Sequence, residues 1–402
     1  MEWKEVDIYQ LCDSVSETYK GNASEVVLIN TSDVLDGKCL NHEYVPNKNL
    51  KGQFKKTFRK GDILYSEIRP ANKRFCFVDF EPKDYIASTK LMVLRAHEDV
   101  DPQYLYQILR SNDTLAQLQM LAESRSGTFP QITYSELSNI MVSLPSQKAQ
   151  KNIVSILSSL DRKIELNNKI NADLEEMAQA IFKNWFVDFE PFKDGKFVDS
   201  ELGMIPEGWK VGRLDEIADV VGGSTPSKAK PEYYTQKGIA WLTPKDLSNH
   251  PAVYTSRGEI DITEEGYNST STKLMPKGTI LFTSRAPIGY ISIAQNDICT
   301  NQGFKSLVPK KAGTCFLYCF LKYVTPEIEN KSTGSTFKEA SGALMKSLQV
   351  IMPEQKVFED FEEIVCPLFA RIESLEKENS RLSLLRDTLL PRLMSGELEV
   401  PE

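Results

Sequence analysis

Residues 60–66 read KGDILYS, and residues 277–283 read KGTILFT. Three further pairs of segments match in the same order along the chain. They are 3–4 (WK) with 209–210 (WK), 126–129 (SGTF) with 334–337 (GSTF), and 145–148 (PSQK) with 353–356 (PEQK). Four ordered matches, each roughly 210 residues apart, indicate a duplication, so the chain is expected to contain one structural unit twice.

A heptad stripe follows the globular part of each copy. Its positions alternate four and three residues apart, the pattern of a coiled-coil seam. The seam residues are Ile153, Leu157, Leu160, Ile164, Asn171 and Leu174 in the first copy, and Phe361, Val365, Leu368, Ile372, Asn379 and Leu382 in the second. Asn171 and Asn379 occupy the same repeat position, where a seam Asn fixes register at some cost in stability. Tolerated polarity at a solvated edge is the alternative interpretation.

The globular parts combine short β-type runs with short helical stretches. Residues 26–29, 75–80 and 279–283 predict strands, and residues 102–120 predict a helix. We therefore expect two similar α+β domains separated by two long helices that form an antiparallel coiled coil, with a pseudo-two-fold internal repeat. The expected bounds are 1–145 for the first domain, 146–187 for the first helix, 188–208 for an ordered connector, 209–353 for the second domain and 354–396 for the second helix.

The length of the two helices suggests a spacing role. A helix rises about 1.5 Å per residue, so ~35–40 residues hold the two domains roughly 50–60 Å apart. Because B-DNA advances about 34 Å per turn, two DNA-reading domains at this separation would lie on neighbouring turns of one duplex.

Composition narrows the class of protein. The 402 residues are 41% hydrophobic and 26% charged, ordinary values for a globular protein. No apolar run approaches the length of a membrane span, and the first residues have no secretory pattern, so we expect a cytoplasmic protein without a membrane partner. The seven cysteines and three isolated histidines show no complete metal-ligand spacing, so reduced, packed thiols and no metal are expected.

The formal charge of −8 does not exclude a nucleic-acid partner, because the charge is unevenly distributed. Residues 209–353 carry 17 Lys and Arg against 13 Asp and Glu. Residues 48–74 carry nine basic side chains against only Asp62 and Glu67. Phosphate neutralisation dominates affinity for DNA, and both regions supply the cations that it needs.

Several motifs resemble one known family. The segments 185–192 (WFVDFEPF), 200–228 (SELGMIPEGWKVGRLDEIADVVGGSTPSK), 277–294 (KGTILFTSRAPIGYISIA) and 389–398 (LLPRLMSGEL) are similar to those of specificity (S) subunits of type I restriction-modification systems. The resemblance covers nearly the whole chain and is weakest at residues 14–58. It implies two target recognition domains, each reading one half of a bipartite duplex DNA site. It also implies that the helices set the spacing and dock two modification subunits, with restriction subunits joining the larger complex.

The sequence contains no recognisable catalytic machinery. It has no Walker-type G-x-x-x-x-G-K-[ST] motif and no glycine-rich fingerprint after a strand. We therefore assign no catalytic residue and no cofactor to this chain. The resemblance implies that S-adenosylmethionine, ATP and Mg belong to the partner subunits, which would carry out methyl transfer and cleavage.

Candidate DNA contacts divide into phosphate-binding and base-reading side chains. For phosphate we nominate Lys55, Lys56, Arg59, Lys73 and Arg74 in the first domain and Lys228, Lys230, Lys305 and Lys338 in the second, together with Ser224 and Thr225 of the 222–226 loop (GGSTP). A solvated charged face is the alternative for any single lysine, and a plain turn is the alternative for the loop.

Base reading favours Arg for guanine and Asn or Gln for adenine. Arg69 and Arg285 follow the matched 60–66 and 277–283 segments, and Asn301 and Gln302 are weaker candidates. The matched loops contribute Ser126, Thr128, Ser335 and Thr336, unless both loops are only structural turns. Two other functions stay open: a scaffold with two protein-binding domains, which salt-sensitive DNA binding would exclude, and a duplicated α+β enzyme, for which no nucleophile, metal cluster or cofactor loop is apparent.

Overall fold

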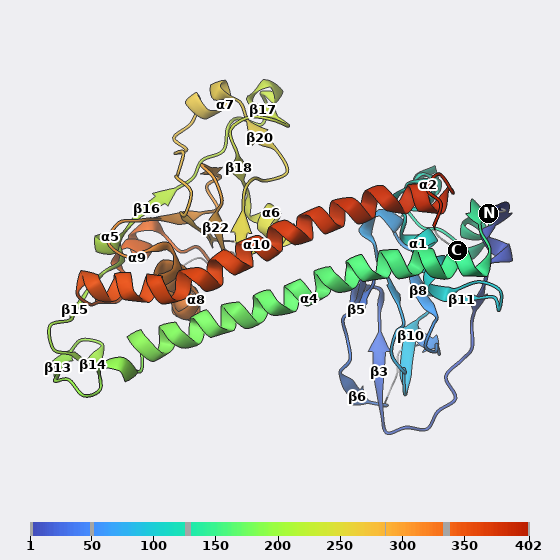
Figure 1. Ribbon diagram of the computed structural model, residues 1–402, viewed down its shortest axis with the longest axis horizontal. Helices are drawn as coiled ribbons and strands as arrows, with labels where there is room; N and C mark the ends of the chain where they lie inside the picture. The colour runs from blue at the N-terminus through green and yellow to red at the C-terminus, as the bar shows by residue number, and fades with distance from the viewer. Residues whose placement is uncertain (1–2, 49–51, 125–129, 286, 333–337, 401–402) are drawn as a thin grey trace. The chain divides into compact units, whose positions relative to one another are not determined.

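The computed structural model describes residues 3–48, 52–124, 130–285, 287–332 and 338–400 (Figure 1). The chain divides into two compact units, Met1–Lys163 with Arg381–Glu402, and Ile164–Ser380. Both units mix strands and helices, which confirms the α+β class. Two long helices, α4 (Gln147–Phe186) and α10 (Gln355–Met394), each contribute one end to each unit.

The first unit is built on two four-stranded sheets with the strand orders β2-β11-β8-β9 and β6-β3-β10-β7. The first sheet is antiparallel throughout, whereas β3 and β10 are parallel in the second. The strands of the two sheets are β2 (Cys12–Val15), β8 (Ile63–Ser66), β9 (Phe75–Phe77) and β11 (Leu91–Ala96), and β3 (Glu25–Ile29), β6 (Tyr44–Pro46), β7 (Phe54–Lys56) and β10 (Tyr85–Ser88). The smaller pairs are β1 (Lys4–Asp7) with β12 (Met141–Leu144) and β4 (Val34–Leu35) with β5 (Lys38–Cys39).

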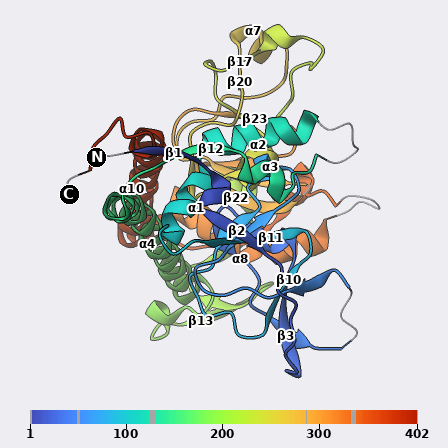
Figure 2. The same cartoon turned by 90° about the vertical axis from the view of Figure 1, so that its right-hand side faces the viewer.

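Strand alternation explains why the 60–66 segment is apolar on both faces. Successive side chains of a strand point to opposite faces. Ile63 and Tyr65 pack into the core formed with the helices, while Leu64 packs into the core that it shares with Val27 and Ile29 of the other sheet. The sheet of β3 and β10 is the more distant of the two from α4 (Figures 1 and 2).

The described residues of the first unit also form three shorter α-helices. They are α1 (Pro102–Arg110), α2 (Asn112–Ser124) and α3 (Tyr134–Ser138). The helix predicted at 102–120 is therefore two helices. Ser111 has extended backbone angles, and its hydroxyl accepts a hydrogen bond from the amide of Thr114 at 3.2 Å, which starts the second helix.

The second unit contains a five-stranded sheet of order β16-β24-β21-β22-β19. Its strands are β16 (Ala218–Gly222), β19 (Tyr254–Thr255), β21 (Ile280–Ser284), β22 (Ile288–Ala294) and β24 (Lys305–Pro309). The two-stranded pairs are β13 (Phe197–Ser200) with β14 (Gly203–Pro206), β15 (Lys210–Arg213) with β25 (Gln349–Met352), β17 (Tyr234–Thr235) with β20 (Asp261–Ile262), and β18 (Trp241–Leu242) with β23 (Cys299–Thr300).

The helices of the second unit are α5 (Leu214–Ile217), α6 (Pro244–Asn249), α7 (Glu264–Asn268), α8 (Thr314–Lys331) and α9 (Gly342–Ser347). Within this unit, α7, β17 and β20 project away from the five-stranded sheet (Figures 1 and 2). The connector is ordered by aromatic packing, with the rings of Phe192 and Trp209 in edge contact at 4.8 Å. Single-turn 3-10 helices lie at Ile8–Gln10, Thr31–Asp33, Pro70–Asn72, Glu190–Phe192 and Pro231–Tyr233.

Inside the second unit the two long helices run antiparallel. The Nδ2 atom of Asn167 donates to Oδ1 of Asn379 at 2.8 Å, and the rings of Phe182 and Phe361 lie 6.2 Å apart. The predicted equivalence of Asn171 and Asn379 therefore does not make them partners, because the antiparallel register places Asn379 opposite Asn167, four residues before Asn171 on α4. Asn379 contacts Asn167 and also Asn168, while Oδ1 of Asn171 is buried without a partner.

The apolar stripe also serves the globular cores, which the heptad interpretation did not foresee. Ile153 and Leu157 pack in the core of the first unit, and Phe361, Val365 and Ile372 pack in the core of the second. Leu160, Ile164, Leu174, Leu368 and Leu382 are only half-buried. Each helix end is covered by a globular part, so the stripe there faces that part as well as the other long helix.

Candidate nucleic-acid interface

The internal repeat is visible as the same backbone hydrogen bonds in both units. The amide of Ile132 donates to the carbonyl of Glu67 at 2.8 Å, and the amide of Ala340 donates to the carbonyl of Ser284 at 2.9 Å. The pairing of Lys4 with Leu144 in β1 and β12 likewise recurs as Lys210 with Met352 in β15 and β25. These equivalent hydrogen bonds and strand pairs set a residue-to-residue correspondence between the two units.

Three chain segments meet at one edge of each unit. In the second unit they are the end of β21, the start of β24, and the residues that follow the 333–337 segment. The amide of Ser284 donates to the carbonyl of Gly303 at 2.8 Å. In the first unit the amide of Glu67 likewise donates to the carbonyl of Lys90 at 3.1 Å. We call the edge around Ser284, Gly303 and Ala340 the β21 edge, and the equivalent edge around Glu67, Lys90 and Ile132 the β8 edge.

The same register shows that Arg69 and Arg285, which follow the two matched segments, do not occupy equivalent positions. Arg285 forms a bridge with Glu339, and Ile68 forms the corresponding bridge with Gln131. Arg285 therefore matches Ile68, and Arg69 lies one residue further on. The reason is that Arg69 begins a tight turn: its φ of 45° is left-handed and its amide donates to the carbonyl of Pro130 at 3.1 Å.

The β21 edge brings together most of the nominated polar residues of the second unit. The amide of Ser224 donates to the carbonyl of Thr300 at 3.0 Å, and the hydroxyl of Thr225 donates to Oε1 of Gln302. Gly223 makes this approach possible, because a Cβ there would lie 2.2 Å from the carbonyl oxygens of Thr300 and Asn301. The 222–226 loop is thus wedged against the segment that holds Asn301 and Gln302.

The side-chain amide of Asn301 already makes a hydrogen bond inside the fold. Its Oδ1 accepts a hydrogen bond from the amide of Gly303 at 2.8 Å. Gln302 is the more exposed of the two residues and has the freer position for a base edge.

A carboxylate that the sequence analysis did not single out lies among the cations of the β21 edge. Oε1 of Glu339 is 3.4 Å from Nζ of Lys305, and its Oε2 is 3.8 Å from an NH1 of Arg285. Lys305 is mostly covered, with 17% of its side chain exposed, whereas Arg285 and Glu339 are 37% and 41% exposed. Both nominated cations therefore start from a partly solvated ion pair, which a phosphate or base edge can replace at little cost.

The β8 edge carries a different set of charges. Lys90 lies 3.6 Å from Glu67, and it was not nominated from the sequence. The ammonium of Lys56 donates to the carbonyl oxygens of Thr89 and Leu91 at 3.2 and 2.8 Å, and burial lowers its pKa from the usual value. Lys56 is therefore a structural lysine that ties β7 to β11. Lys90 replaces it as the cation with an accessible head group.

The other nominated cations are scattered. Arg74 donates from NH1 to the carbonyls of Ser32 and Val34, so it fastens a loop, and Lys230 lies 4.8 Å above the ring of Tyr233. Lys338 donates to the carbonyl of Glu329 at 3.3 Å. Side chains that are exposed belong to Lys55, Arg59, Arg69, Lys73 and Lys228. Ser126, Thr128, Ser335 and Thr336 lie outside the described residues.

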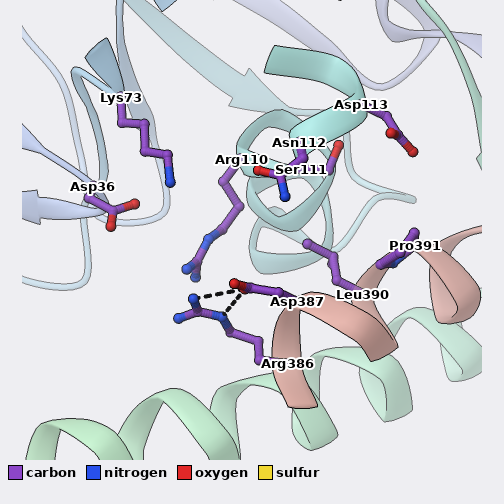
Figure 3. A pocket seen from close by; sticks show the side chains of 10 residues that line it. All are labelled: Asp36, Lys73, Arg110, Ser111, Asn112, Asp113, Arg386, Asp387, Leu390 and Pro391. Carbon is purple, nitrogen blue, oxygen red and sulfur yellow. Dashed lines mark hydrogen bonds and ion pairs between the residues drawn. The ribbon is translucent and has the colours of Figure 1, made fainter. Parts of the chain in front are cut away.

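Lys73 faces a polar cavity of about 170 Å³ in the first unit, at the C-terminal end of α1 (Figure 3). The guanidinium groups of Arg110 and Arg386 point toward one another across this cavity (Figure 3). Oδ2 and Oδ1 of Asp161 lie 2.9 Å from NH1 of Arg110 and 2.8 Å from NH1 of Arg386. One carboxylate therefore joins α1 to both long helices, which makes this cavity a structural junction, apart from the β8 edge.

No helix in the described part of the chain is long and apolar enough to cross a membrane.

Comparison with known proteins gives a consistent result. A family model described as "Type I restriction modification DNA specificity domain" matches residues 2–176 and 206–382, one match in each copy of the repeat. The type I restriction enzyme HindI specificity subunit of Haemophilus influenzae is 33% identical, over 99% of this chain and 100% of its own length.

Two further relatives extend the comparison. The type I restriction enzyme MjaIX specificity subunit of Methanocaldococcus jannaschii is 40% identical over 46% of this chain and 44% of its own length. The crystal structure of a type I restriction-modification system S subunit from M. genitalium is 19% identical and has a TM-score of 0.54, with 100% of this chain and 97% of that chain covered. This last similarity is one of fold.

Proposed function

The chain belongs to the type I restriction-modification DNA specificity family, and from this membership we propose that its two units read the two halves of a bipartite site on duplex DNA. The duplicated edge is the observation that carries the proposal. The β8 edge and the β21 edge have the same backbone hydrogen bonds but different side chains. One framework with two sets of side chains is what reading two different half-sites requires.

In the second unit the readers are the side chains of the β21 edge. Arg285 is suited to guanine, because its guanidinium donates two hydrogen bonds to one base edge. Gln302 is suited to adenine for the same geometric reason, with Thr225 holding its amide in place. Lys305 supplies a phosphate contact that sets the position of the unit on the duplex.

The long helices set the distance between the half-sites and dock two modification subunits, which restriction subunits join. Large apolar side chains that are exposed on both helices are available for this docking. They are Ile156, Leu166, Met177, Ile364, Leu384 and Leu385, with 36–70% of each residue exposed.

Methyl transfer and cleavage belong to the partner subunits in this proposal, and so do S-adenosylmethionine, ATP and Mg. The chain acts by binding and positioning. The lack of a Walker-type motif in the sequence supports this division of labour.

The test compares two lysines at the two ends of β24 in the complex reconstituted with modification subunits. Lys305 begins β24 and Lys310 directly follows it. Each lysine pairs with a carboxylate, Lys305 with Glu339 at 3.4 Å and Lys310 with Asp219 at 2.6 Å. Lys305→Ala should weaken binding to all duplexes alike and flatten the salt slope by about one, while Lys310→Ala should change neither. Equal effects of the two substitutions would place the DNA elsewhere on the unit.

Arg285→Ala tests base reading in the same complex. It should cost about 1–3 kcal/mol on the cognate duplex and relax the preference at one base pair. A uniform loss on every duplex would make Arg285 a phosphate contact.

A further inference from the structure

Two cysteines that are far apart in the sequence meet inside the second unit. Cys315 lies in the first turn of α8, and Cys366 lies on α10, one helical turn after Glu362. The sulfur atoms of Cys315 and Cys366 are 3.3 Å apart, and Sγ of Cys366 is 3.3 Å from Oε2 of Glu362. These three donor atoms all lie within 4.8 Å of one another. Cys319, the sequence neighbour of Cys315, is fully buried and is not part of the cluster.

The carboxylate of the cluster is held in place by the backbone. Oε1 of Glu362 accepts a hydrogen bond from the amide of Phe316 at 2.8 Å, and Oε2 accepts one from the amide of Cys315 at 3.2 Å. Gly313 makes room for it, because a Cβ there would lie 2.1 Å from Cδ of Glu362. Metal-ligating carboxylates are oriented by hydrogen bonds of this kind.

We propose that Cys315, Cys366 and Glu362 bind a thiophilic divalent cation of the Zn²⁺ class, which joins α8 to α10. Two sulfurs and one oxygen with water as the fourth ligand form a tetrahedral zinc site. Zn–S bonds of about 2.3 Å place two sulfurs roughly 3.7 Å apart in a tetrahedron, so the thiols need to separate by only about 0.4 Å.

Charge and access agree with this assignment. Two thiolates and a carboxylate around Zn²⁺ carry a net charge of about −1, which the N-terminus of α8 favours because its free amides are positive. Soft sulfur ligands select Zn²⁺ over Mg²⁺ and Ca²⁺. Cys366 is exposed while Cys315 is only 3% exposed, so the ion reaches the site from the side of Cys366, where the water ligand would also lie.

The experiment titrates the reduced full-length chain with Co²⁺, which reports thiolate ligation by a charge-transfer band in the near ultraviolet. We expect one equivalent to bind, Zn²⁺ to displace it, and Zn²⁺ to raise the unfolding temperature of the second unit. Cys366→Ser should abolish the band and the thermal shift, and it is exposed enough to leave the fold intact. Cys319→Ser is the matched control and should keep both.

Glu362→Gln adds a second line of evidence, because it removes the charge and leaves one amide oxygen to accept a backbone hydrogen bond. It should weaken Co²⁺ binding at least tenfold while the thiolate band persists at saturation. The proposal is overturned if the reduced wild-type chain gives no thiolate–cobalt band, if the band survives Cys366→Ser, or if the two thiols form only a disulfide and bind no metal. The proposal does not depend on DNA binding.

Discussion

Asp161 offers a direct test of how the first unit holds the long helices. Its carboxylate bridges Arg110 of α1 and Arg386 of α10, at 2.9 and 2.8 Å, from its own position on α4. Asp161→Asn keeps the shape of the side chain and removes the charge that both guanidinium groups share.

The expected loss follows from the partial burial of the junction. The side chains of Arg110, Arg386 and Asp161 are 11%, 19% and 31% exposed. Breaking a fully buried pair costs about 3–5 kcal/mol, and an exposed pair contributes about 0–1 kcal/mol. An intermediate loss of about 2 kcal/mol is therefore expected for Asp161→Asn.

Asp387→Asn is the matched control. Asp387 pairs with the same Arg386 at 2.9 Å, but its side chain is 49% exposed, so its loss should be at most about 0.5 kcal/mol.

Calorimetry and amide hydrogen exchange measure the difference. For a unit of this size, about 2 kcal/mol lowers the unfolding temperature by roughly 4–8 °C. Where exchange in α1 occurs through unfolding of the first unit, it should accelerate about 30-fold, because 1.4 kcal/mol corresponds to about a factor of ten. Equal effects of the two substitutions, or an unchanged transition in Asp161→Asn, would refute the view that this carboxylate ties α1 to both helices.

Three further predictions address the edge, the titration of a buried acid and the helices. Glu339→Gln frees Lys305 and Arg285, so it should tighten binding to non-specific duplexes and steepen the salt slope; unchanged binding across a salt series would exclude an electrostatic role for Glu339. Burial raises the pKa of Glu376 from 4.5 to about 7, with Glu175 and Glu373 adding to the shift. Because the folded state then binds the proton more tightly than the unfolded chain, the free energy of unfolding of the second unit should fall as pH rises from 4.5 to about 7. Glu376→Gln should lessen that fall in chemical-denaturation curves, and an identical pH profile would contradict the assignment. Inserting one heptad into both α4 and α10 should lengthen the gap in the modified sequence by roughly 10 Å, or about three base pairs, as read by modification mapping; an unchanged gap would show that the helices do not set it.

The duplication could be predicted from the sequence because local motifs recur in order. The 60–66 and 277–283 segments became β8 and β21, each buried on both faces. The long helices were also predictable, since a heptad stripe is a local pattern. The break at Ser111 was missed because Ser is also tolerated inside helices, and only its extended backbone and the cap that it forms end α1.

Contacts between side chains could be predicted from the sequence far less well than the duplication and the long helices. Lys56 and Arg74 stand in a basic stretch that predicts phosphate contacts, yet both donate to backbone carbonyls that only the folded chain brings near. Glu339 was overlooked because nothing in its neighbouring residues links it to Arg285 and Lys305. Cys319 is the cysteine nearest to Cys315 in sequence, whereas the sulfur that Cys315 contacts in space is that of Cys366, about 50 residues away in sequence. Such contacts depend on tertiary packing, which motif spacing does not encode.

Long-read mapping of modified adenines tests the central claim most directly. The measurement uses cells that produce this chain together with its modification subunits, compared with cells that lack this chain alone. The predicted result is a motif of two short sequences separated by a fixed gap, which is modified only when the chain is present. An uninterrupted motif, or no modified adenine although the complex has assembled, would contradict the reading of two half-sites by two units.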